Sequence, residues 1–179
     1  MTLRIMLDLE TMSTHANAAI VSMGACANDG RPDFYARVDL QSCMALGLKV
    51  DASTIMWWLQ QEKAAQLALC GQGHSLSGAL QNFAKWLKLN NQSDDDHKPV
   101  ECELWAFPAS FDVTILEQAY KALGMRTPWH YRAPRCLRTA AALFPNVPKV
   151  TATTKHDALA DAKAQMQWLE AILQEAKAA

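Results

Sequence analysis

Residues 4–12 of the chain, Arg-Ile-Met-Leu-Asp-Leu-Glu-Thr-Met, form a short apolar run that two acids interrupt. Successive side chains of a β-strand point to opposite faces of the sheet. One face would carry Leu3, Ile5, Leu7 and Leu9, whereas the other would carry Met6, Asp8 and Glu10. The two carboxylates would therefore face the same way.

An apolar strand of this kind belongs in the interior of a sheet, where an unpaired ionised carboxylate costs on the order of several kcal/mol. Two neighbouring carboxylates also repel each other unless a cation lies between them or one of them takes up a proton. A hard divalent metal ion would solve both problems. The alternative is that Asp8 and Glu10 are solvated acids at the end of an edge strand, so acids from elsewhere in the chain must decide.

The chain has 179 residues, half of them apolar, and a net charge of -1. This length suits one hydrophobic core, and we expect residues 1–179 to form a single domain. The net charge excludes a protein that holds nucleic acid by general basic charge alone, so any nucleic acid must be bound locally. Five cysteines without a C-x-x-C pair favour reduced thiols over a disulfide framework or a zinc ribbon. With no apolar run of about 20 residues and no signal peptide, we expect a soluble, cytoplasmic protein that does not enter a membrane.

Hydrophobic periodicity predicts strands first and then mainly helices. The first strand is followed by an apolar run over 18–27, a turn at Asn28-Asp29-Gly30 and a strand over 33–38, which together indicate an antiparallel meander. Helices are predicted over 41–45, 53–61, 62–70 and 77–89. A brief strand over 103–107 is ended by Pro108, Ser110 is the expected N-cap of a helix over 111–123, and the last helix covers 157–176.

Three segments carry charged or aromatic side chains. Trp57 and Trp58 would point about 100° apart on a helix, so we expect one of them at a rim, although core packing is the default for each. Residues 126–138 hold four arginines, one histidine and no acid, which indicates a solvated surface or, alternatively, phosphate contacts or a partner surface. The aspartates at 94–96 are expected to be solvated and are left out of the site.

Two later acids lie on helix faces where apolar side chains are expected. Asp112 heads the apolar stripe that continues through Ile115, Leu116, Ala119 and Leu123, although a first-turn acid that complements the helix dipole is the alternative. Asp161 heads a column with Gln165, Trp168 and Ile172. His156 precedes Asp161 by five residues, at or just before the start of the same helix.

These acids resemble, in their order and context, the DEDDh branch of the 3′-5′ exonucleases. Asp8-Leu9-Glu10-Thr11 is similar to the first motif of that family, Ser110-Phe111-Asp112 to the second, and the run from His156 to Asp161 to the third. Residues 57–61 and 135–139 extend the resemblance to the phage-type, exonuclease VIII and Rv2179c-like group. One position departs from it: the second motif of the family usually has an Asn before Phe-Asp, and this chain has Phe107-Pro108 in that region.

The resemblance implies an α/β, RNase H-like fold, in which helices flank a mixed five-stranded sheet made of an antiparallel meander and parallel strands. It also implies 3′-5′ exonuclease activity that releases nucleoside monophosphates from the single-stranded 3′ end of DNA or RNA. Two Mg²⁺ or Mn²⁺ ions, ~4 Å apart, would be bound by oxygen ligands alone. By this likeness Asp8 would bridge the ions, Glu10 and Asp161 would bind one of them, Asp112 would reach the other, and His156 would be the general base.

The same resemblance places four further residues against the substrate: Thr11, Met12, Trp57 and Phe111. Small exonucleases of this type are often dimers, which favours a subunit interface, and hence a homodimer, for residues 126–138. Two rival interpretations remain at this point. One is a phosphatase of the HAD type, which the Asp8-Leu9-Glu10 run only faintly resembles because its second acid is not Asp. The other is a nucleic-acid-binding protein of the same fold with impaired catalysis, which Phe107-Pro108 keeps open.

Overall fold

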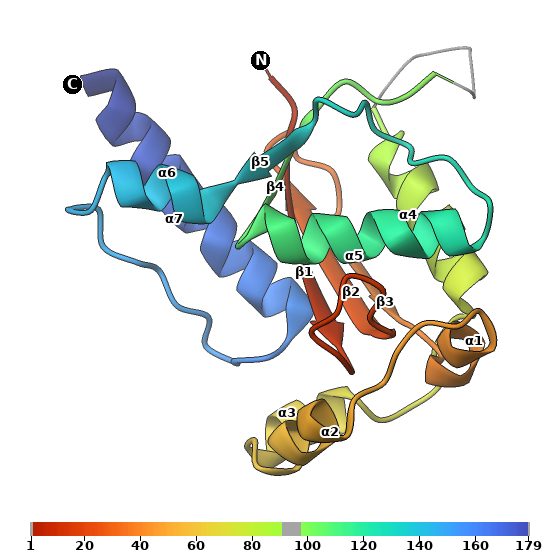
Figure 1. The fold of residues 1–179 in the computed structure, drawn as a ribbon. Helices are drawn as coiled ribbons and strands as arrows, with labels where there is room; N and C mark the ends of the chain where they lie inside the picture. The colour runs from red at the N-terminus through yellow and green to blue at the C-terminus, as the bar shows by residue number, and fades with distance from the viewer. Residues whose placement is uncertain (1, 91–97, 179) are drawn as a thin grey trace.

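The computed structural model describes residues 2–90 and 98–178 (Figure 1). Its five-stranded sheet has the order β3-β2-β1-β4-β5. The strands are β1 (Arg4–Thr11), β2 (Ile20–Ala27), β3 (Phe34–Arg37), β4 (Glu103–Ala106) and β5 (Pro134–Cys136). Strands β1, β2 and β3 pair antiparallel, whereas β4 pairs parallel with β1 and β5 parallel with β4. The predicted mixed sheet is confirmed, and the first strand lies at its centre.

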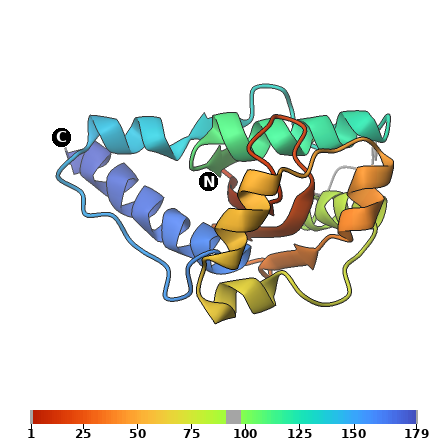
Figure 2. The same cartoon turned by 60° about the horizontal axis from the view of Figure 1, so that its bottom comes forward.

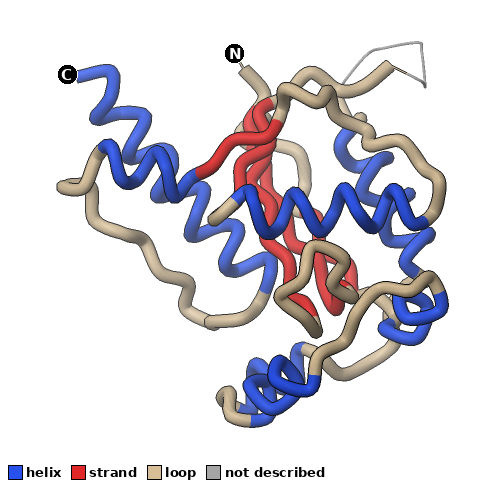
Figure 3. The backbone as a smooth tube through the Cα atoms, viewed as in Figure 1, coloured by secondary structure: helices blue, strands red, loops and turns tan. Residues whose placement is uncertain are grey.

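Seven helices are found among the described residues: α1 (Leu40–Ala45), α2 (Ala52–Leu59), α3 (Lys63–Ala68), α4 (Leu76–Leu87), α5 (Ala109–Ala122), α6 (Leu137–Leu143) and α7 (Ala158–Ala178). One face of β1, with Ile5, Leu7 and Leu9, packs against α4 and α5 in the larger core. The other face, with Met6, packs against α6 and α7 in a second core. Helix α5 crosses in front of the strands in Figure 3, and α2 and α3 form a separate pair at the end of the sheet.

The start of α5 differs from the prediction. Pro108, not Ser110, is the N-cap, and α5 begins at Ala109. The carbonyl of Pro108 accepts hydrogen bonds from the amides of Phe111 and Asp112, so the first turn closes without a side-chain cap. Ser110 therefore lies within the first turn of α5. The sequence analysis preferred Ser110 because serine is a common N-cap, but the proline already supplies the extended backbone that a cap requires.

Strand β5 and helix α6 lie in or directly after the basic segment 126–138, where no regular element was predicted. Both are short, and β5 is an edge strand with an exposed middle residue, Arg135. An edge strand of three residues shows too little alternation to be recognised in the sequence. The aspartates at 94–96 lie outside the described residues.

Gly24 allows the start of α7 to approach the sheet closely. In β2 it pairs with Asp8, and a Cβ at this position would lie 2.2 Å from the backbone carbon of Ala158. Only glycine leaves room for a backbone at that distance. The helix therefore begins directly over the middle of the sheet. No helix within residues 2–90 and 98–178 is long and apolar enough to cross a membrane.

Candidate active site

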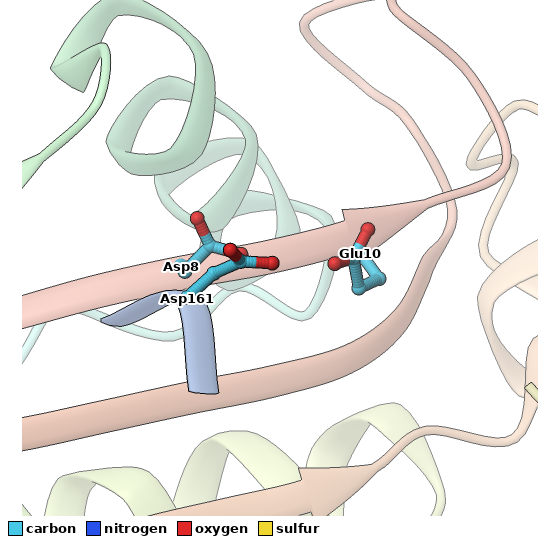
Figure 4. A group of neighbouring side chains, drawn as sticks. All are labelled: Asp8, Glu10 and Asp161. Atoms are coloured by element: carbon cyan, nitrogen blue, oxygen red, sulfur yellow. The ribbon is translucent and has the colours of Figure 1, made fainter. Parts of the chain in front are cut away.

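Three acids from two elements meet at the C-terminal end of β1. Asp8, Glu10 and Asp161 each offer a carboxylate oxygen, and these oxygens all lie within 4.8 Å of one another. Figure 4 shows Asp8 and Glu10 on the strand, with Asp161 of α7 reaching toward them. Asp8 and Glu10 share a face because they are two residues apart, and this face is the one that α7 covers.

Asp161 owes its position to the start of α7. The side chain of Asp157 accepts a hydrogen bond from the amide of Ala160, and its carbonyl accepts one from the amide of Asp161, which together close the first turn. Gly24 allows this turn to lie close to β2, next to the strand that carries Asp8. The backbone geometry at the start of α7 therefore holds Asp161 on the helix side of the cluster without the help of a bound ligand.

Asp112 reaches the same region from the other side. Its side chain is 3% exposed, and its Oδ1 accepts a hydrogen bond of 3.1 Å from the amide of Leu9. Strand β4 pairs with β1 only as far as Met6 and ends at Ala106, so the amide of Leu9 lies beyond its reach. Asp112 supplies the missing acceptor from the first turn of α5. It is thus not one of the three acids within 4.8 Å, but it joins the strand directly between Asp8 and Glu10.

Burial is the largest cause that raises the pKa of each of these acids. The pKa of Asp8 lies well above its usual range because of burial and then the charges of Asp112 and Glu10. Burial, followed by the charge of Asp161, raises the pKa of Glu10 to about 8. Burial also raises the pKa of Asp112 to about 7 and raises that of Asp161. With no cation bound, Glu10 is therefore largely protonated at neutral pH.

Gln165 is a contact of the cluster to which the sequence analysis gave no role. Its Nε2 donates a hydrogen bond of 2.7 Å to Oδ1 of Asp8, whereas its Oε1 is buried without a hydrogen-bond partner among the described residues. Its position was visible in the sequence, one helical turn after Asp161 in the same column. What the sequence could not show is that this column faces Asp8, because that depends on how α7 crosses β1.

His156 lies in the loop before α7 and not in the helix. The backbone of His156 is left-handed, with a φ of 61°, and this conformation costs a non-glycine residue roughly 1 kcal/mol or more. The amide of His156 offsets this cost by donating a 2.9 Å hydrogen bond to Oδ2 of Asp161. The imidazole packs edge-on against Trp57, with 4.9 Å between ring centroids. The loop that carries the histidine is thus anchored both to the acid cluster and to α2, which lies beside the start of α7 in Figure 2.

A cavity of about 410 Å³ adjoins the acids on the side of α2. It contains three of the four predicted substrate-contacting residues, Thr11, Trp57 and Phe111, together with Glu10. Met12 is not among the residues that line it; its amide donates a hydrogen bond to the carbonyl of Ala19, and its carbonyl accepts one from the amide of Asp51.

The two neighbouring tryptophans of α2 point in different directions, as expected for adjacent residues of a helix. Trp58 is 3% exposed and its Nε1 donates to the carbonyl of Thr11, whereas Trp57 is 42% exposed and faces the cavity. The default expectation of core packing is therefore wrong for Trp57, and the expected rim position is occupied by this residue.

The fold places the arginines of the basic segment 126–138 in different surroundings. Arg132 and Arg135 lie near Thr2 and Glu101, toward the N-terminal ends of β1 and β4. Arg138 instead lies on α6, with its guanidinium carbon 5.2 Å from the centroid of the Phe107 ring. The segment is therefore not one surface, and Arg138 contacts a residue that lines a cavity together with Asp161.

The donor set of the cluster fits a hard divalent cation. All its ligand atoms are carboxylate oxygens, which suit Mg²⁺ or Mn²⁺ rather than zinc. Burial and then the repulsion of neighbouring acids raise the pKa values of Asp8 and Glu10, so a bound cation would favour the ionised form of both carboxylates. Oxygen ligands of this type hold the metal ions that catalyse phosphodiester hydrolysis, and the adjoining cavity is lined by three aromatic side chains, Trp57, Trp58 and Phe111.

Two solved structures share the fold of this chain. The nuclease domain of 3'hExo, a DEDDh family member solved bound to rAMP, aligns with a TM-score of 0.67 and 13% identity over 97% of this chain and 92% of that chain. The cell-death related nuclease 4 (CRN-4) aligns with a TM-score of 0.52 and 10% identity over 97% of this chain and 64% of that chain. At such low identity these likenesses establish the fold alone.

Among curated proteins, no sequence matches the chain. A family model does: the Rv2179c-like 3'-5' exoribonuclease domain matches residues 3–173, which is nearly the whole chain. The resemblance drawn from the three sequence motifs is thereby confirmed. The chain belongs to the family of Rv2179c-like 3'-5' exoribonuclease domains.

Proposed function

We propose that this chain, as one domain, removes nucleoside monophosphates from the 3′ end of single-stranded nucleic acid by metal-dependent hydrolysis. The observation that carries the proposal is the group of Asp8, Glu10 and Asp161, whose oxygens lie within 4.8 Å of one another beside an open cavity. The name of the family supports RNA as the first substrate to examine. Single-stranded DNA stays an alternative substrate that the same experiment tests.

Asp8, Glu10 and Asp161 would hold Mg²⁺ or Mn²⁺, and Asp112 would contribute to a second ion. When bound, such ions polarise the phosphodiester and activate water. The cavity lined by Thr11, Trp57 and Phe111 would receive the terminal nucleoside, since the ring of Trp57 is open to solvent and can stack on a base.

His156 would take a proton from the attacking water. Its imidazole lies at the edge of Trp57, and its backbone is tied to Asp161, so a movement of the side chain alone could bring it over the acids. Replacement by Ala should lower the single-turnover rate by ~100-fold and flatten the rise of rate with pH near neutrality. An unchanged rate and pH profile would remove His156 from the mechanism.

The activity itself is tested with 5′-labelled single-stranded RNA and DNA in the presence of Mn²⁺. We expect a ladder that shortens from the 3′ end and nucleoside monophosphates as products. A circular strand, and a strand that ends in a 3′-phosphate, should resist. Efficient cutting of the circular strand would contradict an exonuclease, and binding without cleavage would favour the non-catalytic alternative.

A homodimer is a separate proposal, and the arginines on and before β5 are its suggested interface. Arg132 and Arg135 are exposed near an edge strand, which leaves them free to contact a second copy. Light scattering on the wild type and on an Arg132→Glu, Arg135→Glu variant tests this. A dimer in the wild type and a monomer in the variant is the expected result, and a monomer in both would exclude it.

A further inference from the structure

Two cations pack on the ring of Phe107, a residue that lines a cavity together with Asp161 of the acid cluster. The guanidinium of Arg138 lies 5.2 Å from the centroid of the Phe107 ring, and the ammonium of Lys149 lies 5.0 Å from the same centroid. Lys149 also lies 5.8 Å from the ring of Trp168. Among the ion pairs of the described residues, none involves Arg138 or Lys149. Both side chains belong to exposed residues.

A cation that packs on an aromatic ring keeps its full charge, whereas a salt bridge neutralises it. The ring of Phe107 is itself fixed by the edge of Trp168, with 5.5 Å between centroids. Phe107 belongs to the stretch in which the chain departs from the second motif of the DEDDh exonucleases. The ring of Phe107 directly follows β4 and precedes α5, the helix that carries Asp112. It orients the side chains of Arg138 and Lys149, which no carboxylate of the described residues neutralises.

The position of these cations relative to the acids suggests what they bind. Lys149 and Phe107 line a second cavity together with Asp161, His156, Gln165 and Lys155. The first cavity contains Glu10, and Glu10 and Asp161 belong to the same group of oxygens. The acid cluster therefore borders two cavities of different chemistry: one lined by Trp57, Trp58 and Phe111, and one lined by Lys149 and Lys155.

We propose that Arg138 and Lys149, oriented by Phe107, bind the phosphodiester backbone of the substrate strand on the 5′ side of the bond that is cut. The proposal rests on the proposed function, because it takes the aromatic cavity as the site of the terminal nucleoside. A strand whose 3′ end lies there would pass the acids toward the second cavity, which Lys149 lines and whose Phe107 contacts Arg138. Lysine and arginine contacts to phosphates position a strand without reading its sequence.

An Arg138→Gln, Lys149→Gln variant tests the proposal. The Kd for a fluorescent 5′-labelled single-stranded oligonucleotide, measured by anisotropy with Ca²⁺ to prevent turnover, should rise about tenfold. The salt dependence should also weaken, by ~0.7 in the slope of log K against log salt for each lost phosphate contact. Phe107→Leu, which removes the ring but no charge, should raise the Kd by a smaller factor.

The matched control is a Lys121→Gln, Lys177→Gln variant, which loses the same charge at the far ends of the two helices that carry Asp112 and Asp161. It should bind the oligonucleotide as the wild type does. Equal weakening in both double variants would attribute the effect to net charge and overturn the proposal, as would an unchanged Kd and salt slope in the Arg138, Lys149 variant.

A mononucleotide ester, the p-nitrophenyl ester of a nucleoside 5′-monophosphate, separates this proposal from the proposed function. For the Arg138, Lys149 variant the loss of kcat/KM on the oligonucleotide should exceed its loss on the ester by about tenfold. Equal losses on both substrates would contradict a role in strand binding. If the wild type cleaves neither substrate, the proposed function fails, while the binding measurement still decides whether the two cations hold a strand.

Discussion

At the turn between β2 and β3, Arg31 is 6% exposed and its guanidinium donates hydrogen bonds to the carboxylate of Asp29 and to the carbonyls of Trp86 and Leu87. Those hydrogen bonds lower the pKa of Asp29 to about 2. At the C-terminal end of β1, in contrast, burial and mutual repulsion raise the pKa of Glu10 to about 8. The first group balances its charge and joins α4 to the sheet. The second leaves its charge unbalanced, which destabilises the fold but prepares the site for a cation.

Replacement of Asp112 by Asn tests the group of buried acids at the C-terminal end of β1 most directly. The amide oxygen can still accept the hydrogen bond from Leu9, but the carboxylate is lost. Turnover of the labelled strand should fall by at least ~10³-fold. The metal-free protein should become no less stable, because a buried charge no longer opposes folding. Activity close to that of the wild type would show that Asp112 is not needed for the reaction.

Replacement of Arg31 by Met tests the ion pair of Arg31 with Asp29, in which the charges balance. Asp29 and the end of α4 lose their donor, so the free energy of unfolding should fall by about 2–3 kcal/mol in urea denaturation, while Mn²⁺ affinity stays unchanged. Lys163→Met is the control, since it breaks an exposed ion pair with Asp33, which water screens, and it should lower the free energy of unfolding far less than Arg31→Met does. Equal costs in the two variants would contradict the structural role of Arg31.

Replacement of Gln165 by Met sharpens the comparison, because this residue orients Asp8 without carrying charge. Mn²⁺ affinity, measured by calorimetry without substrate, should fall about tenfold, the lower end of the effect of residues that hold metal ligands. The exposed Gln167 on the same helix provides the control, as Gln167→Met should change nothing. A lower melting temperature without a change in Mn²⁺ affinity would give Gln165 a structural role only.

The pH dependence should show the smallest effect. Unfolded carboxyl groups release their protons near pH 4, whereas folded Glu10 and Asp112 keep theirs up to about pH 8 and 7. Between these limits the folded state binds more protons, so the metal-free protein should lose about 1 kcal/mol or more of stability from pH 5 to pH 8. Stabilisation by Mn²⁺ should grow over the same range. Thermal unfolding with and without Mn²⁺ measures both trends, and a metal-free stability that rises with pH would contradict the assignment.

The sequence by itself determined the parts of this protein that depend on local periodicity. The alternation in residues 4–12 placed Asp8 and Glu10 on one face, and the stripe of residues 112–123 indicated that Asp112 is buried. The order of apolar runs and turn residues predicted the meander, and the three motifs identified the family, whose resemblance implied the mixed sheet. The faces of residues 4–12 and 112–123 follow from spacing alone, because each lies within a single strand or helix.

Only the tertiary structure decided which side chains meet across elements. Gln165 reaches Asp8, and Asp112 reaches the amide of Leu9, because Gly24 admits the start of α7 and because β4 ends two residues short of the acids. Arg138 lies beside Phe107, apart from Arg132 and Arg135, because the three-residue edge strand β5 and the start of α6 lie within the basic segment. A strand that short gives no hydrophobic periodicity in the sequence. Such contacts join residues far apart in the chain, and their geometry is set by the packing of α5, α6 and α7 on the sheet, which no local spacing contains.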